Sequence, residues 1–347
     1  MLTSLVTGGA GFIGSHVVDE LLRMGHDVVV LDDLSGGFRE NVSRDADLVV
    51  GSITDHELVD RLFAQHHFSY VFHLAAYAAE GLSHFIKRFN YTNNLIGSVN
   101  LINASVNSGT VRCFVFTSSI AVYGPGQVPM LESLTPQPAD PYGIAKYAVE
   151  MDLHEARDMF GLDFVVFRPH NVYGERQNIG DRYRNVIGIF MNQILKGQPM
   201  TIFGDGEQTR AFTHIADVAP IIARSIERAG ALGDVFNVGA DKPYTVNHLA
   251  SVVAAAMGVT PQVLHLEARS EVVHAFSDHS KVRRVFGDST SSIDLEEGVR
   301  RMTAWVRTAG AKMTKMFAGI EVAKKLPPSW RQLDYLVRAR HVGRDPV

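Results

Sequence analysis

The sequence predicts an α/β protein with a doubly wound parallel sheet, followed by a smaller second α/β region. Short runs in the first half are apolar at consecutive positions, as expected of strands buried on both faces. Amphipathic segments of helical length separate these runs, and a glycine-rich segment joins the first run to the first helix. With 46% hydrophobic and 20% charged residues, the 347-residue chain can bury one or two globular cores.

Expected strands and helices alternate from residue 2 to about residue 170. The strands are expected at residues 2–7, 27–31, 47–50, 70–74, 113–117 and 164–167. The helices are expected at residues 15–24, 56–65, 91–108 and 142–160. Asp140 can cap the last helix, and Pro141 occupies its first position, where the missing N–H costs nothing.

The pattern becomes irregular beyond Asn171. A turn cluster, Phe203-Gly-Asp-Gly206, precedes helices expected near residues 215–229 and 246–257 and strands expected near 235–238 and 262–266. We therefore expect a sheet domain over residues 1–172, to which the chain returns near 205–240, and a second region over 173–310. Residues 311–347 carry eight Lys/Arg and three Asp/Glu and form a basic C-terminal extension.

Composition and charge exclude several classes of partner. The 33 Lys+Arg and 37 Asp+Glu give a net charge of −4, which argues against a nucleic-acid or membrane partner. The single Cys113 excludes a disulfide framework and a cysteine-rich metal site, and no metal is expected. No apolar run reaches the roughly 18 residues of a membrane span, and no basic segment with a cleavage site opens the chain. We expect a soluble cytoplasmic protein.

The glycine-rich segment predicts a dinucleotide site. Gly8-Gly-Ala-Gly11-Phe-Ile-Gly14 follows the first expected strand and opens the first helix, where backbone can approach a diphosphate closely. Asp32 ends the second strand, where a carboxylate can accept the ribose hydroxyls of NAD. Asp32 and Asp33 would repel the 2′-phosphate of NADP. We therefore expect a Rossmann-type domain that binds NAD.

Tyr142 and Lys146 are four residues apart, on one face of an expected helix. A phenol has a pKa near 10, and a neighbouring ammonium together with a positive nicotinamide would favour the phenolate. Tyr142 could then remove a hydroxyl proton while a hydride leaves the same carbon. Ser119 follows an expected strand at the carboxyl edge of the sheet, where its hydroxyl could bond the reacting oxygen.

Taken together, these features resemble the extended short-chain dehydrogenase/reductase family, and within it the nucleotide-sugar epimerases. The resemblance runs from Leu2 to about Gly287. The segments that carry it are Thr7-Gly-Gly-Ala-Gly-Phe-Ile-Gly14, His73-Leu-Ala-Ala76, Asn94-Leu-Ile-Gly97, Ser119, Tyr142 with Lys146, Arg168-Pro-His-Asn-Val-Tyr-Gly174 and Phe203-Gly-Asp-Gly-Glu-Gln-Thr-Arg210.

The resemblance implies three groups of site residues. Its catalytic residues would be Ser119, Tyr142 and Lys146. Besides Tyr142 and Lys146, its cofactor contacts would be Gly8, Gly11, Phe12, Ile13, Gly14, Asp32, Asp33, Ser52, Ile53, Leu74, Ala75, Ala76, Asn94 and Thr117. Besides Ser119, contacts to a nucleotide-diphosphate sugar would be Asn171, Asn185, Val186, Thr201, Phe203, Arg210 and Arg269. Guanidinium and amide donors suit two phosphates.

Departures from the family pattern reduce the number of reactions that the chain is expected to catalyse. Ser52 stands where the family usually has an aspartate beside the adenine. Dehydrating relatives place an acidic pair, and decarboxylating relatives a glutamate, before the Val-Tyr-Gly step, where this chain has Ile120-Ala121. Elimination of water needs an acid and a base beyond the tyrosine. The expected reaction is 4-epimerisation of UDP-glucose and UDP-galactose through a transient 4-keto sugar.

Several alternatives stay open at this stage. The substrate could be UDP-glucuronate or UDP-N-acetylglucosamine, and the same residues could serve a nucleotide-sugar 4-ketoreductase with a dissociable cofactor. A catalytically silent NAD-binding subunit is a remote alternative. His73 and His170 are interpreted as packing residues, and Glu80 could approach the sugar. The family commonly dimerises through two helices per subunit, here 91–108 and 142–160, so a homodimer is expected.

Overall fold

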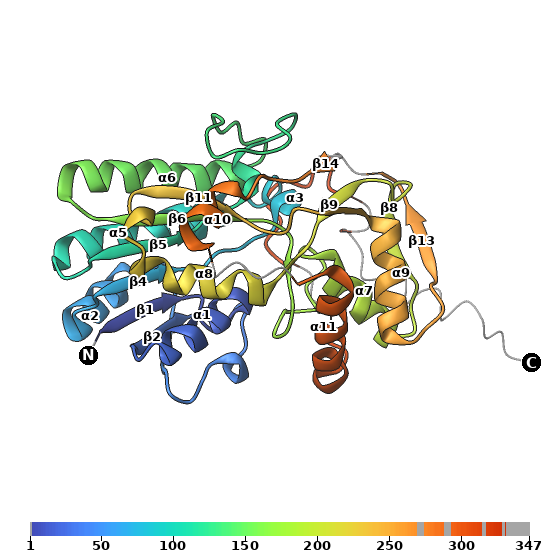
Figure 1. Ribbon diagram of the computed structural model, residues 1–347, viewed down its shortest axis with the longest axis horizontal. Helices are drawn as coiled ribbons and strands as arrows, with labels where there is room; N and C mark the ends of the chain where they lie inside the picture. Colours follow the sequence, from blue (N-terminus) through green and yellow to red (C-terminus); the bar gives the residue numbers. More distant parts are fainter. Residues whose placement is uncertain (1, 269–273, 288–292, 314–316, 328–329, 331–347) are drawn as a thin grey trace, which may run out of the picture.

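The computed structural model describes residues 2–268, 274–287, 293–313, 317–327 and 330. Seven strands form the main sheet in the order β11-β6-β5-β4-β1-β2-β3, and all neighbours pair in parallel (Figure 1). These strands are β1 (Thr3–Thr7), β2 (Asp27–Asp32), β3 (Asp47–Val50), β4 (Tyr70–His73), β5 (Cys113–Thr117), β6 (Phe164–Pro169) and β11 (Asp234–Val238). The predicted fold class is confirmed.

The order of the strands positions the site. Chain order reverses between β1 and β4, which lie side by side although β2 and β3 come between them in the sequence. In an open parallel sheet, ligands bind outside the carboxyl ends of the strands at such a reversal. The glycine-rich segment and the ends of β4 and β5 therefore border one crevice.

Helices cover both faces of the sheet, as Figure 1 shows. One face packs against α1 (Phe12–Arg23), α8 (Ala219–Arg224) and α10 (Ser280–Phe286). The other face packs against α2 (His56–His66), α5 (Gly97–Ser108) and α6 (Pro141–Phe160). Apolar strand side chains point both ways, which is why the runs read as continuously apolar.

Two expected helices differ from those in the structure. In place of 91–108, α4 (Lys87–Tyr91) passes through a π-helical turn, η2 (Thr92–Ile96), into α5. Such turns are common at functional sites. In place of 215–229 there are α8 and three 3₁₀ turns, η4 (Ile215–Asp217), η5 (Ser225–Glu227) and η6 (Ala229–Ala231). Pro220 has no N–H to donate, so α8 starts beside it.

The second region packs its own core. Its helices are α7 (Val186–Leu195), α9 (Val246–Met257) and α11 (Leu295–Ala309). Short strands pair as β8 (Met200–Phe203) with β13 (Val263–Leu266), β7 (Val172–Tyr173) with β10 (Thr213–His214), and β9 (Thr209–Ala211) with β12 (Pro243–Thr245) and β14 (His274–Ala275). The domain limits expected from the sequence stay a prediction. Among the described helices, none is both long and apolar enough to cross a membrane.

A buried ion pair ties α6 to the sheet. Arg168 on β6 donates through Nε to Glu150 on α6 at 3.0 Å, and both side chains are at most 4% exposed. The Ser118 hydroxyl also donates to Glu150, and the Arg168 guanidinium lies 4.7 Å from the centroid of the Tyr123 ring. Ser118 thus has a structural partner of its own.

We expect Glu150→Leu to lower the free energy of unfolding by about 3–5 kcal/mol, because it leaves the Arg168 charge buried without its counter-ion. The double variant Glu150→Leu/Arg168→Met should recover most of that loss. Urea denaturation monitored by circular dichroism measures both. A single variant within about 1 kcal/mol of the unsubstituted chain would show that the pair is not effectively buried.

Candidate active site

The glycine-rich loop joins β1 to α1 at the carboxyl edge of the sheet. Gly8 has a φ of +72°, and a Cβ there would lie 2.7 Å from the Ala75 nitrogen in the loop after β4. A Cβ on Gly14 would lie 2.1 Å from the Gly8 carbonyl oxygen. Gly11 precedes α1, whose first residues are Phe12 and Ile13. Bare backbone at the start of a 12-residue helix fits the diphosphate of NAD.

Asp32 braces the same loop from the end of β2. Its carboxylate accepts hydrogen bonds from the Ala10 nitrogen at 2.9 Å and the Leu34 nitrogen at 2.8 Å. Burial raises the pKa of Asp32, and these two backbone hydrogen bonds oppose that shift. Asp33 is exposed and accepts from the Ser35 nitrogen at 2.9 Å. Asp32 therefore shapes the loop, and its contact to the ribose stays a prediction.

The predicted adenine side is formed after β3. The hydroxyls of Ser52 and Thr54 are hydrogen-bonded at 2.9 Å, so Ser52 has a local partner where the family usually has an aspartate. Ile53 packs over Gly97, where a Cβ would lie 2.6 Å from the Ile53 Cδ1. The Ile53 carbonyl accepts from Asn100 at 2.9 Å. This loop is thus fixed by α5.

Asn94 and His73 support the loop after β4, which includes the predicted contacts Leu74, Ala75 and Ala76. Asn94 lies in the π-helical turn and accepts from the Tyr77 nitrogen at 2.8 Å while donating to the Tyr77 carbonyl at 3.2 Å. His73 bridges the hydroxyls of Thr7 and Ser98 at 2.7 and 2.8 Å. Burial lowers the pKa of His73 well below its ordinary value, so the ring is neutral. Its contacts agree with the packing interpretation.

Tyr142, Lys146 and Ser119 converge at the ends of β5 and α6. Asp140 caps α6 by accepting from the nitrogens of Tyr142 and Gly143 at 2.9 and 3.0 Å. One turn further, Lys146 Nζ donates to the Thr117 carbonyl at 2.7 Å and lies 5.9 Å from the centroid of the Tyr142 ring. The Ser119 side chain acts on the Tyr142 phenol by lowering its pKa, and the Ser119 hydroxyl accepts from the Ala121 nitrogen at 3.2 Å. The sequence spacing thus places these groups together.

Thr117 contributes a second polar group at this edge. Its Oγ1 is buried and has no hydrogen-bond partner among the described residues. An unsatisfied buried hydroxyl costs free energy unless a further molecule supplies a partner. This hydroxyl fits the predicted cofactor contact.

Burial shifts the pKa values of Tyr142 and Lys146 in opposite directions. Burial raises the pKa of the Tyr142 phenol, while the hydrogen bond from Ser119 lowers it. Burial lowers the pKa of the Lys146 ammonium to about 7, while the Glu150 carboxylate opposes that shift. The chain by itself therefore does not lower the pKa of Tyr142, contrary to the simplest expectation for a lysine neighbour. Lowering it depends on the positive nicotinamide expected beside it.

Two of the predicted substrate contacts are amides, one just after β6 and one before α7. Asn171, in the left-handed conformation with φ +40°, donates to the Ala211 carbonyl at 3.1 Å. Asn185 caps α7 through the Ile187 nitrogen at 2.9 Å and donates to the Val172 carbonyl at 2.9 Å. Both amides therefore hold the segment that links β6 to α7.

The other predicted substrate contacts are spread over three elements. Val186 begins α7, and Thr201 and Phe203 belong to β8, where the Thr201 hydroxyl accepts from Gln193 at 2.9 Å. Arg210 on β9 donates to the Thr209 carbonyl at 2.8 Å. Arg269 lies outside the described residues. The structure therefore describes all of these predicted contact residues except Arg269.

Three charged side chains beyond the predicted site set influence the pKa of Tyr142, namely Glu80, Asp140 and Arg184. Glu80, at the start of α3 (Glu80–Ser83), raises the pKa of Tyr142, and Arg184 lowers it. The sequence suggested that Glu80 could approach the sugar, but it gave no indication of a role for Arg184, which lies just before α7. No motif or spacing indicates Arg184, because only the folded loop brings it across the crevice.

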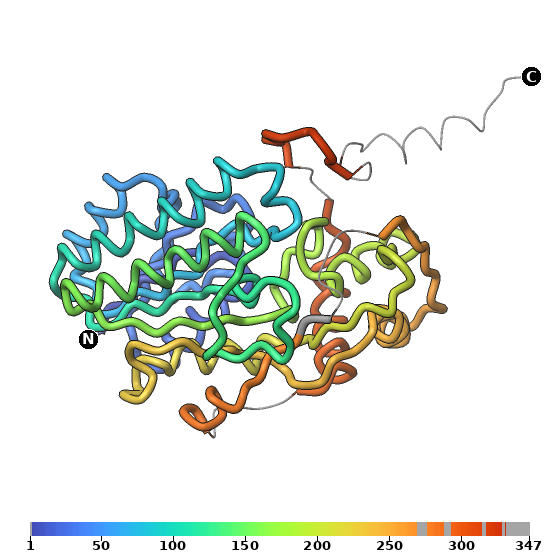
Figure 2. Tube along the Cα trace, turned by 90° about the horizontal axis from the view of Figure 1, so that it is seen from above, coloured from blue at the N-terminus to red at the C-terminus, as the bar shows by residue number. Residues whose placement is uncertain are grey.

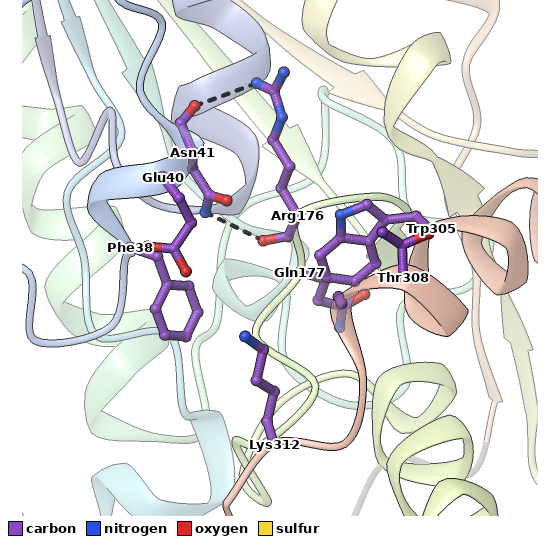
Figure 3. A pocket seen from close by; sticks show the side chains of 9 residues that line it. Phe38, Glu40, Asn41, Arg176, Gln177, Trp305, Thr308 and Lys312 are labelled. Carbon is purple, nitrogen blue, oxygen red and sulfur yellow. Dashed lines mark hydrogen bonds between the residues drawn. The ribbon is translucent and has the colours of Figure 1, made fainter.

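A separate cavity of about 260 Å³ lies between the segment after β2 and α11 (Figure 3). Phe38 and Trp305 lie on opposite sides of it, and Lys312 points between them. Hydrogen bonds between Asn41 and Arg176 close one end. None of the predicted site residues lines this cavity.

Comparisons with known proteins agree with the resemblance seen in the sequence. The model of the NAD dependent epimerase/dehydratase family matches residues 4–239. A UDP-glucose 4-epimerase from Mycolicibacterium smegmatis is 36% identical over 314 residues, which cover 88% of this chain and 99% of the relative.

Solved structures give the same result. A UDP-glucose 4-epimerase from Thermotoga maritima, solved with UDP-glucose, has a TM-score of 0.84 and 36% identity, covering 89% of this chain and 99% of that one. A UDP-glucuronic acid 4-epimerase from Bacillus cereus, in complex with UDP-glucuronic acid and NAD, has a TM-score of 0.81 and 27% identity, covering 89% and 100%.

The lowered pKa of Lys146 predicts a pH-dependent stability. Between about pH 7 and the ordinary lysine value of 10.5, the unfolded chain binds more protons than the folded chain, so the free energy of unfolding rises with pH. Lys146→Met removes this contribution. Urea denaturation at pH 7 and pH 10 should show the unsubstituted chain gaining stability relative to Lys146→Met. A difference that is constant over this range would contradict the buried, weakly basic lysine.

Proposed function

Because the chain belongs to the NAD-dependent epimerase/dehydratase family, we propose that it is a nucleotide-sugar 4-epimerase acting first on UDP-glucose and UDP-galactose. NAD is the cofactor, as the sequence predicted. The observation that carries the proposal is the meeting of Ser119, Tyr142 and Lys146 beside the glycine-rich loop. A chain that only bound NAD would have no need of this constellation.

In this proposal Tyr142 handles the proton of the sugar 4-hydroxyl. Its phenol is buried, and Ser119 lowers its pKa; in the proposal the Ser119 hydroxyl holds the same sugar oxygen in line. NAD supplies the acceptor and donor for the hydrogen on C4. Tyr142 takes the hydroxyl proton as the keto sugar forms and returns it as the keto sugar is reduced on its other face. No net oxidation occurs.

The segment after Ser119 favours epimerisation over dehydration. Ile120, Ala121 and Val122 form a 3₁₀ turn whose side chains carry no acid or base. Loss of water from the sugar would need a further proton donor and acceptor at this place. Glu80 influences Tyr142 electrostatically, but it is an exposed residue at the start of α3.

The choice of sugar is the finer part of the proposal. UDP-glucose is our first choice because the relatives from Mycolicibacterium smegmatis and Thermotoga maritima are UDP-glucose 4-epimerases. The Bacillus cereus neighbour is a UDP-glucuronic acid 4-epimerase. Proton NMR of the purified protein with UDP-glucose, UDP-glucuronate or UDP-N-acetylglucosamine compares these substrates. We expect UDP-galactose to form fastest. Turnover only with added NADH and a 4-keto sugar would instead identify a ketoreductase.

Tyr142→Phe should lower the epimerisation rate at least about 100-fold, because it removes the proton-transfer group. The NAD content of the purified variant should stay unchanged. Tyr147→Phe, which removes a hydroxyl from the same helix outside the site, serves as the matched control. Substantial activity in Tyr142→Phe would exclude this residue as the base.

We further infer a homodimer through the outer faces of α5 and α6. These helices pack side by side in Figure 1. Ile144 and Met151 are 43% and 55% exposed and lie two turns apart on one face of α6, and Ile96, in η2 just before α5, is 50% exposed. A second copy would bury this apolar stripe by antiparallel helix packing.

Met151→Asp should convert the dimer into a monomer, because it places a charge in the buried stripe. Light scattering after size exclusion measures the mass. Met313→Asp is the control, since Met313 is 82% exposed and lies far along the chain from α5 and α6. A monomeric unsubstituted chain, or a dimer that survives Met151→Asp, would contradict this interface.

A further inference from the structure

Arg184 reaches across the crevice from the second region. It precedes Asn185, the cap of α7. Its guanidinium carbon lies 5.6 Å from the centroid of the Tyr77 ring, in the loop after β4. Its Nη2 lies 3.1 Å from where a Cβ on Gly36 would be, in the loop after β2. One guanidinium therefore spans the two loops that border the predicted cofactor position.

The positive charge of Arg184 influences the pKa of two tyrosines at the candidate site. Burial raises the pKa of Tyr142 and of Tyr77, and Arg184 opposes that shift at both phenols. Asp181 Oδ2 lies 2.9 Å from Arg184 Nε and forms an ion pair with it, but this contact does not have the geometry of a hydrogen bond. The buried Nε donates no hydrogen bond to any described residue. A positive group is thus held at the crevice with at least one donor direction unused.

The chemistry of the proposed ligands matches this group. NAD and a nucleotide-diphosphate sugar each carry a diphosphate, and the planar donors of a guanidinium fit phosphate oxygens in pairs. A diphosphate between the loops after β2 and β4 would also lie near the N-terminus of α1, where negative charge is favoured.

The C-terminal extension holds the loop that carries Arg184. Phe317 packs on Tyr77, with ring centroids 5.3 Å apart, and Trp330 packs on Tyr183 at the same distance. Figure 2 shows the red segment of the extension alongside the segment of α3 and α4. The two aromatic contacts therefore connect the loop after β4 with the loop before α7.

Polar contacts anchor the extension at both ends of this bridge. The Glu321 carboxylate accepts from the nitrogens of Arg88 and Phe89 at 2.8 and 2.9 Å, at the start of α4. The Lys312 nitrogen donates to Asn192 of α7 at 2.9 Å. Leu326 and Trp330 are 6% and 5% exposed in one cluster with α3. Within the described part of the extension, these two side chains are therefore packed into a core beside α3.

We propose that Arg184 binds a phosphate of a bound diphosphate and that Trp330 is a positioning residue that holds the Arg184 loop in place. This inference rests on the proposed function, since that function supplies the two diphosphates. The source is either the cofactor or the nucleotide sugar, and the experiment separates them. The proposal adds Arg184 to the binding residues that the sequence pattern indicated, and it adds Trp330 as a residue that positions Arg184.

The test compares Arg184→Ala with Arg112→Ala, which removes an exposed arginine before β5, at the opposite edge of the sheet. NAD released from the denatured protein gives cofactor content, and calorimetry with UDP gives the affinity for the substrate diphosphate. Loss of one charge-assisted contact should weaken binding about ten- to a hundredfold. Arg112→Ala should change neither quantity.

Each outcome has one meaning. Weaker UDP binding with full NAD content assigns Arg184 to the substrate diphosphate, and loss of NAD with unchanged UDP affinity assigns it to the cofactor. Arg184→Ala with both quantities unchanged overturns the proposal while the proposed function stands. An unsubstituted chain that holds no NAD and binds no UDP overturns the proposed function and the role of Arg184 with it.

Trp330 is tested through its dependence on Arg184. Trp330→Ala should raise the KM for the nucleotide sugar several-fold, with kcat nearly unchanged, and Trp330→Phe should restore most of the loss. In the Trp330→Ala background, Arg184→Ala should weaken binding less than it does alone, because the loop is already displaced. Fold-changes that simply multiply would overturn the positioning role.

Discussion

The hydrogen bond from Lys146 Nζ to the Thr117 carbonyl is the contact on which the site depends. It joins α6 to the carboxyl end of β5 and fixes the rotation of the helix. Tyr142, one turn earlier on the same face, is thereby held beside Ser119 at the edge of the sheet. Because the ammonium is buried, its pKa falls to about 7, and the fold must balance this cost elsewhere.

That balance extends along α6. Glu150 lies one turn beyond Lys146, raises the pKa of that ammonium, and pairs with Arg168 on β6. Phenol, ammonium, carboxylate and guanidinium thus follow one another inward from the crevice. A mutation of Arg168 or Glu150 can therefore change the pKa of Tyr142 through the charges that lie between them.

The sequence predicted the sheet well, because strands buried on both faces leave continuous apolar runs. β3 and β5 have the expected limits, and the spacing of Tyr142 and Lys146 was enough to place them together. The π-helical turn at Asn94 was not predictable, since its contacts to Tyr77 form only in the folded chain. Arg184 escaped notice for the same reason. The docking of the C-terminal extension depends on aromatic contacts between distant segments, which no local pattern indicates.

Two parts of the chain have different roles in the proposed reaction. In the proposed function, the sheet domain supplies the proton-transfer group, and the second region supplies the proposed contacts that hold the nucleotide while the sugar turns. In the proposed mechanism, the hydrogen on C4 leaves and returns without exchanging with water. The direct measurement is epimerisation of UDP-glucose in D₂O, followed by NMR at C4. We expect UDP-galactose with full protium at C4, whereas deuterium at C4 would contradict the proposed mechanism.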